Sequence, residues 1–447
     1  MEQFQLILVS GDFPDLMFFN WGTHFPGGPS AAIADGVVIR HNELIDTYAH
    51  NFRQILADHP YVRNDAITDE GDFYMMPFLR LNPADRTSGA FFIRQDWLDN
   101  LGLDRPTNIN EWEYVLTAFR DRDPNGDGQS VIPFISTPIV EIHGVQQWMS
   151  AWGLSAWNNG FMNVDGAVQF GPAMDEYREF LTTMARWYRE GLIDPDFLTT
   201  DRARHSQLVT TDQAGAFYGL INSFMGAYTG IMNDINPDFD LRAAHFPQAP
   251  DGGRYIFQVD AARAVAPAGF AITTANRHPR ESMLWMDYFY YEDGRILMNL
   301  GIENESFIVN PDGSFAFTEL VTDSGLPLDQ SIARLAPAGT SARLFQDPRY
   351  WILMMAHENQ VEAMPILGAG DPSRILPPIT MTPEDSQRFA TVFSQIQTFV
   401  GESFARFVLG TDDIDAGWDS YINTLHQLGI EEAIELQQRA LEAYFRR

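Results

Sequence analysis

Hydrophobic residues gather along this chain in two patterns, short apolar runs and longer stretches with helical spacing. The short runs contain or border Gly, Pro or Asp, and they lie at 14–19, 72–78, 89–94, 212–219 and 267–275. Such runs are typical of buried strands. The helical spacing occurs at 41–56, 108–123, 173–191, 279–294, 383–410 and 415–445. Because strands and helices alternate and the last part is helical, the pattern predicts an α/β fold with a helix-rich C-terminal region.

Aromatic residues within these elements indicate which faces should be buried. Trp112, Trp187 and Trp285 occupy apolar-face positions of their helices, so we expect all three in the core. Trp97 has the same structural interpretation. Beside it, Arg94 and Asp96 are expected to form an ion pair within one element.

Composition narrows the class of protein. The chain has 447 residues, which suggests two domains or one large α/β unit. Its 29 basic and 60 acidic residues give a net charge of −31, which argues against a nucleic-acid partner. The sequence contains neither Lys nor Cys, and this excludes a P-loop, disulfides and Cys-ligated zinc.

The start of the chain shows no targeting segment. Residues 1–16 lack the basic region and cleavage site of a signal peptide, and no stretch approaches the ~20 apolar residues that span a bilayer. Instead they look like the end of an amphipathic helix that leads directly into a strand. We therefore expect a fragment whose first elements are missing.

Several segments together resemble a known family. They are SGDFPDLMF at 10–18, DFYMMP at 72–77, FFIRQDWLDNLGLDRPTNINEW at 91–112, WYREGLIDPDFLT at 187–199, PAGFAITT at 267–274 and SFARFVLGTDDIDAGWDSYINTLHQLGI at 403–430. Their order and spacing resemble the bacterial extracellular solute-binding proteins. More narrowly, they are similar to the large carbohydrate-binding lipoproteins of ABC importers, in the broad maltose-binding-protein class. The resemblance spans nearly the whole chain.

The resemblance implies a two-lobed periplasmic-binding fold of type II, with a ligand cleft between lobes that close on the ligand. We expect residues 1–137 in the first lobe, 138–268 in the second, 269–335 back in the first, and 336–447 mainly in the second. The implied function is a non-catalytic, monomeric extracellular receptor, which captures a sugar or oligosaccharide and delivers it to ABC permease subunits. No cofactor is required. The link to the membrane would be an N-terminal lipid anchor outside this chain.

Other functions remain open at this stage. The receptor of a sensor system would have the same features, and an aromatic-rich cleft also suits peptides or other polar solutes. A glycoside-processing enzyme needs only two suitably spaced carboxylates, which a chain with 60 acidic residues has in abundance. A zinc-protease helix is excluded, because the HENQV segment has Val361 where the second His is required.

Candidate ligand-binding residues follow from the chemistry of sugars, whose apolar faces and hydroxyls suit aromatic platforms bordered by polar side chains. In α/β sheets such ligands gather at strand ends. The candidates chosen by these criteria are Trp21, Tyr74, Trp148, Trp152, Trp157, Tyr218 and Asn222. For each of them the alternative is ordinary core packing.

The segment DRDPNGDGQSVIPF at 121–134 resembles a calcium-binding loop. Its first four ligand positions hold Asp123, Asn125, Asp127 and the carbonyl of Gln129. The ninth and twelfth positions are Val131 and Phe134, so side-chain ligands are missing there. Two interpretations remain, a structural calcium ion and a tight polar turn in which the side chains bond to nearby backbone amides.

Overall fold

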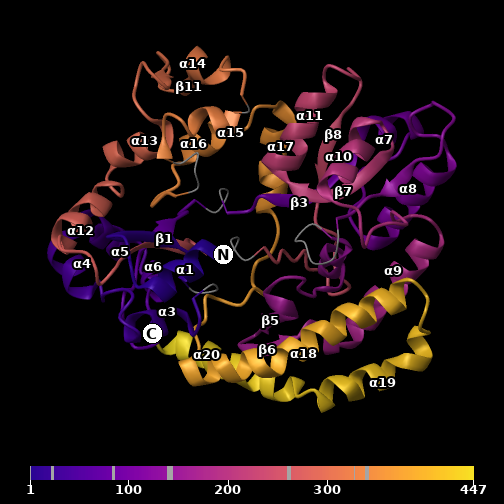
Figure 1. Ribbon diagram of the computed structural model, residues 1–447. Coiled ribbons are helices and arrows are strands. Elements are labelled where there is room, and N and C mark those ends of the chain that lie inside the picture. The colour runs from indigo at the N-terminus through magenta and orange to yellow at the C-terminus, as the bar shows by residue number, and fades with distance from the viewer. Residues whose placement is uncertain are drawn as a thin grey trace.

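The structure of the protein is a computed structural model that describes residues 2–21, 25–82, 86–137, 144–258, 263–326, 328–337 and 342–447. Two lobes lie side by side, and each is built on its own sheet (Figure 1). The α/β architecture predicted from the alternating pattern is therefore confirmed.

The first lobe is centred on a three-stranded antiparallel sheet with the order β1-β9-β2. Its strands are β1 (Leu16–Phe19), β9 (Val265–Ile272) and β2 (Met76–Leu79). Its helices are α1 (Glu2–Ser10), α3 (Gly28–Ala34), α4 (Asn42–Tyr48), α5 (His50–Asp58), α6 (Tyr61–Ala66), α12 (Pro279–Tyr288) and α13 (Glu292–Leu300). Because the central strand β9 comes from a much later part of the sequence, this lobe is built from discontinuous segments.

A small subdomain follows α13 and has a hydrophobic cluster of its own, which includes Leu300, Phe307, Val321 and Tyr350. It consists of β10 (Phe307–Val309), β11 (Phe315–Phe317), α14 (Glu319–Thr322), α15 (Leu328–Ile332) and α16 (Pro348–Leu353). In Figure 1 these elements form the orange group at the top of the molecule.

The second lobe is centred on a four-stranded mixed sheet with the order β4-β7-β3-β8, in which β4 runs parallel to β7. Its strands are β4 (Ile132–Phe134), β7 (Ala214–Leu220), β3 (Gly89–Arg94) and β8 (Leu241–Ala244). The helices and turns around it are α7 (Gln95–Leu101), α8 (Ile109–Asp121), α9 (Asp175–Arg189), α10 (Arg202–Thr210), α11 (Ala227–Met232), α17 (Glu358–Gly368), the 3₁₀ helices η2 (Val145–Trp152), η3 (Asn158–Gly160) and η4 (Gly171–Ala173), and the π-helix η5 (Ile221–Gly226). A hairpin of β5 (Phe161–Val164) and β6 (Ala167–Phe170) lies beside the C-terminal helices.

The central strands of the second lobe are buried on both faces. Along β3, Phe91 and Ile93 belong to one hydrophobic cluster, whereas Ala90 and Phe92 belong to another. Successive side chains of a strand point to opposite faces, so this division follows directly from the backbone geometry. It explains why the 89–94 run is apolar throughout and does not alternate with polar residues.

Three helices end the chain and connect the lobes along one side of the molecule (Figure 1). They are α18 (Pro383–Val408), α19 (Ile414–Gln427) and α20 (Ile430–Arg446). Helix α18 packs against α9 of the second lobe. At the end of α20, the Tyr444 hydroxyl donates a hydrogen bond of 2.6 Å to Asp65 of the first lobe. Arg447 pairs with Asp69 nearby, at 2.7 Å. The C-terminus therefore ties the two lobes together.

The expected lobe boundaries need correction. Residues 89–134 are expected in the first lobe, but β3 and β4 pair with β7 and so belong to the second. The chain first crosses between β2 and β3, and it returns between β8 and β9. It crosses again between α16 and α17, because α17 packs on β8. These boundaries depend on strand pairing between segments that are distant in sequence, and the local apolar pattern does not reveal that pairing.

Several local predictions agree with the structure and others do not. Trp97, Trp112 and Trp187 are fully buried in the core, as predicted. Arg94 donates to Asp96 at 2.8 Å, so the predicted ion pair is confirmed. The expectation for Trp285 is wrong, because this side chain is 49% exposed on the outer face of α12. Within the described residues, no helix is both long and apolar enough to cross a membrane.

Candidate functional site

A cavity of about 520 Å³ lies between the two lobes, and we call it the interlobe cavity. Its lining includes Phe18, Phe78, Arg80, Arg343 and Gln346 from the first-lobe side, Ser88, Leu220 and Asn222 from the second lobe, and Trp351 of α16. Its size is within the range of small-molecule sites, about 300–1,000 Å³. Aromatic rings and polar side chains face the same space, which is the combination that a sugar requires.

Two further cavities continue from it. The first, of about 190 Å³, shares Ala266 and Pro267 of β9 with the interlobe cavity and is also lined by Tyr74 and Asp65. The second, of about 390 Å³, shares Asn159 with the first and lies between η2, α9 and α18. The three cavities therefore adjoin one another in pairs through shared lining residues.

The crossing segments beside the interlobe cavity are held together by hydrogen bonds. Gln258 is buried, and its side-chain carbonyl accepts from the backbone amides of Ser88 at 2.9 Å and Gly89 at 3.1 Å. The hydroxyl of Tyr218 interacts with the same glutamine. The segment that enters the second lobe at Ser88 is thus fixed to the segment that leaves it.

Three of the predicted ligand-binding residues line these cavities. Asn222 lines the interlobe cavity, and its side-chain oxygen accepts from Gln360 at 2.9 Å. Tyr74 lines the smallest cavity, where burial raises the pKa of its hydroxyl to about 12. Trp157 lines the third cavity, and its indole N–H donates to Gln147 at 3.3 Å. Each stands on a different cavity, so the structure does not bring them into one cluster.

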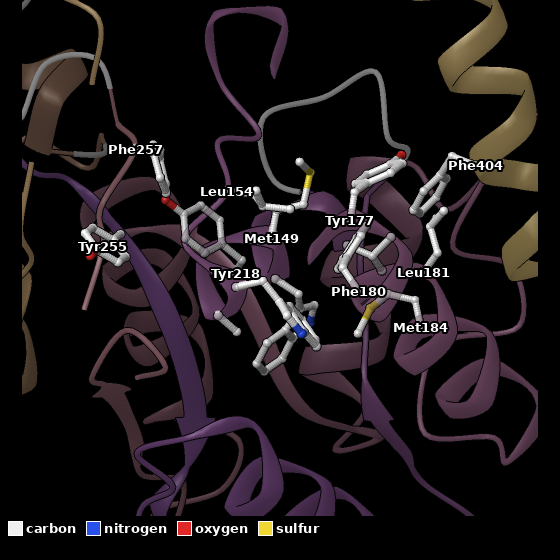
Figure 2. Close-up of a cluster of buried hydrophobic side chains, with 14 of the residues drawn as sticks. Met149, Leu154, Tyr177, Phe180, Leu181, Met184, Tyr218, Tyr255, Phe257 and Phe404 are labelled. Atoms are coloured by element: carbon white, nitrogen blue, oxygen red, sulfur yellow. The ribbon is translucent and has the colours of Figure 1, made fainter. Parts of the chain in front are cut away.

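The other four predicted residues lie in hydrophobic cores. Trp21 packs among the aromatic side chains of the first lobe. Trp148 and Trp152 belong to the large core of the second lobe, 0% and 7% exposed. Figure 2 shows Tyr218 in that same core, and it is 1% exposed. These four side chains are therefore part of the hydrophobic cores in this structure.

Among the lining residues of the interlobe cavity that the sequence pattern did not reveal are Phe78, Arg80, Arg343 and Trp351. Phe78 and Arg80 stand at the end of β2, where the strand-end argument applies equally. Arg343 and Trp351 come from a segment with no strand pattern. It reaches the cavity because Leu79 donates to Leu344 at 2.9 Å and accepts from Gln346 at 2.8 Å.

The 121–134 loop forms a compact turn in which its own side chains pair with its backbone. The carboxylate of Asp123 accepts from the amide of Gly128 at 3.2 Å, and that of Asp127 accepts from Gln129 at 2.7 Å. The side-chain oxygen of Asn125 is buried without a hydrogen-bond partner among the described residues. Phe134 is fully buried in the core, so the twelfth position cannot supply a ligand.

Comparison with known proteins shows similarity over nearly the whole chain. Residues 1–296 match the family described as bacterial extracellular solute-binding protein. The fructooligosaccharide ABC transporter substrate-binding protein FusA of Streptococcus pneumoniae is 23% identical over 99% of this chain and 82% of its own length. Lipoprotein LipO of Bacillus subtilis is 20% identical over 97% of this chain and 82% of its own length. The solved structure of the alginate-binding protein AlgQ2 without calcium ion is 27% identical, with a TM-score of 0.77 over 99% of this chain and 88% of that chain.

Proposed function

The chain belongs to the bacterial extracellular solute-binding proteins, and we propose that it captures an oligosaccharide and delivers it to the permease of an ABC importer. The observation that carries this proposal is the interlobe cavity, where Phe78 and Arg80 of one lobe face Asn222 of the other. A ligand held there contacts both lobes at once. It therefore stabilises the closed state over any open state in which one set of contacts is lost.

The relatives support a carbohydrate cargo. FusA is described as a fructooligosaccharide-binding protein of an ABC transporter, and AlgQ2 as an alginate-binding protein. Both cargoes consist of several sugar units, which agrees with a series of three adjoining cavities. LipO is described as a lipoprotein, and we propose a comparable lipid anchor to hold this receptor at the outer face of the cell membrane.

A binding screen tests the receptor function. The purified chain is melted in the presence of oligosaccharides and peptides, and binding to the folded state alone raises the melting temperature. We expect a rise with oligosaccharides, which chromatography should recover uncleaved. A bound sugar that is recovered as fragments would identify an enzyme. A rise with peptides alone would contradict the carbohydrate cargo.

Trp351 should contribute a stacking surface for the ligand. It is half-buried and lines the interlobe cavity. Replacing it by Ala should weaken oligosaccharide binding about tenfold, or about 1.4 kcal/mol, because one aromatic platform is lost. Isothermal titration calorimetry measures the change. Trp285→Ala is the matched control, since Trp285 lies on the outer face of α12, and it should bind as wild type. Equal affinities of both variants would show that Trp351 does not contribute to ligand binding.

We further propose that the 121–134 loop is a polar turn that does not depend on calcium. At the ligand positions of this loop only Asp123 and Asp127 offer charged oxygens, and both already accept backbone hydrogen bonds. Calcium affinity decreases as the number of charged ligands decreases. Sites with few charged ligands have dissociation constants of about 1 mM or higher. The melting temperatures in EDTA and in 1 mM calcium should therefore agree within about 1 °C. A rise of several degrees, abolished in Asp123→Ala, would show a structural calcium site.

A further inference from the structure

Two arginines stand together on the first-lobe side of the interlobe cavity. The guanidinium carbon of Arg80 lies 5.5 Å from the centre of the Phe78 ring, and that of Arg343 lies 5.3 Å from the same ring. Their backbones are held in register, because Leu79 bonds to both Leu344 and Gln346. The arginine pair is therefore built into the sheet edge and does not depend on a loose surface loop.

Arg343 has unused hydrogen-bonding capacity. Its Nε and Nη1 atoms are buried and have no hydrogen-bond partner among the described residues. The next acid along the chain, Asp347, is occupied by Arg349 at 2.6 Å. Burial lowers the pKa of Arg343, and the positive charge of Arg80 adds to this effect. A buried N–H donor without a partner is costly, so a ligand that accepts these bonds is favoured.

The charge of the cavity is opposite to that of the whole protein. The chain carries a net charge of −31, yet none of the described residues that line the interlobe cavity is an Asp or a Glu, whereas two are arginines. Arg80 and Arg343 are therefore the charged side chains among the described lining residues.

We propose that the cargo is an acidic oligosaccharide, with the carboxylate of a uronic acid unit bound by Arg343 and Arg80 and its ring against Phe78. This inference rests on the proposed receptor function and adds the class of sugar. A guanidinium presents its N–H groups as a planar fork that matches a carboxylate. Phe78 and Trp351 supply apolar surfaces for the sugar ring beside it. A neutral sugar would offer no negative charge to Arg343, whose Nε and Nη1 atoms have no hydrogen-bond partner among the described residues.

The decisive experiment compares ligands that differ only in charge. Oligogalacturonates and their methyl esters share one backbone, and esterification removes the negative charges. Oligomers of mannuronate and guluronate, neutral galacto- and fructo-oligosaccharides, and a sulfated oligosaccharide complete the panel. Calorimetry at low and high salt gives the affinities. We expect a uronate oligomer to bind about 100-fold more tightly than its uncharged counterpart, and less tightly as salt rises.

Variants of Arg343 connect this preference to the residue. Arg343→Gln should reduce the preference for the acidic ligand to less than about tenfold. Arg343→Lys keeps the charge but loses the planar guanidinium, so its preference should lie between those of Arg343→Gln and the wild type. The ligand-free melting temperature of Arg343→Gln should fall only slightly, because the substitution removes a half-buried charge together with its contacts to the rings of Phe78 and Tyr350. Arg277→Gln is the control for net charge, since Arg277 is exposed and does not line the cavity.

The outcomes separate this inference from the receptor function on which it rests. Tight binding of a neutral oligosaccharide, unchanged in Arg343→Gln, would overturn the acidic cargo and leave the receptor function standing. Binding of the sulfated sugar in preference to every uronate would contradict the proposed recognition of a carboxylate. Binding of no sugar at millimolar concentration would overturn both proposals.

Discussion

The Trp148→Ala variant should be about 3–5 kcal/mol less stable than the wild type, the usual cost of removing a large aromatic side chain from a packed core. Trp148 is 0% exposed, and its ring centre lies 4.3 Å from that of Phe91 and 5.0 Å from that of Trp112. Phe134 and Trp187 lie at 5.1 Å on other sides. Unfolding in urea, followed by circular dichroism, measures the loss.

Trp148→Phe is the matched variant for this test. It keeps an aromatic ring in the same position and removes an indole N–H that has no hydrogen-bond partner within the described part of the chain. We therefore expect it to lose less than half as much stability as Trp148→Ala. A Trp148→Ala protein that melts like the wild type but binds oligosaccharide weakly would show that Trp148 belongs to the ligand site and not to the core.

Acidification should destabilise the first lobe through His41. This side chain is fully buried, and its Nε2 accepts a hydrogen bond of 3.0 Å from the backbone amide of Ile272. Burial lowers the pKa of His41 to about 3. The folded state therefore keeps the imidazole neutral, whereas the unfolded chain protonates it near its ordinary pKa of about 6.5. The contribution of neutral His41 to the free energy of unfolding is complete above pH ~6.5 and is lost as the pH falls toward 3.

The expected size of this effect at pH 5 is about 2 kcal/mol relative to pH 7. His41→Gln is the variant that isolates it, because glutamine offers an oxygen to the Ile272 amide but does not titrate. Urea unfolding at pH 7 and pH 5 should show that the wild type loses about 2 kcal/mol more than His41→Gln. Equal losses in both proteins would show that His41 is not held neutral.

The sequence identified strands β1, β2, β3, β7 and β9, the long helices α8, α9, α18, α19 and α20, and the family. The type II periplasmic-binding fold that the resemblance implied is confirmed, as is the class of bacterial extracellular solute-binding proteins. The 89–94 run became β3 and the 383–410 stretch became α18, because apolar spacing and capping residues act locally. Where a stretch was predicted as one helix, at 279–294, the chain forms α12 and α13 with a break between them.

The assignment of tryptophans to core or cleft was less successful, for a physical reason. The sequence makes Trp148 a candidate for the ligand site, yet its segment folds as the 3₁₀ helix η2 and places the side chain in the core. Trp285 has helical spacing among apolar residues, yet it faces outward. Which side of an element is covered depends on what packs against it, and neighbours distant in sequence decide that.

By itself, the sequence determined the main strands and long helices, the α/β class, the absence of cysteine chemistry and the solute-binding family, since these depend on composition and on local or family-wide patterns. Only the tertiary structure decided that β3 pairs with β7 and that Arg343 stands beside Arg80. Both facts arise from hydrogen bonds between segments more than a hundred residues apart. Such contacts gain their free energy only when the sheets assemble, so no local pattern encodes them.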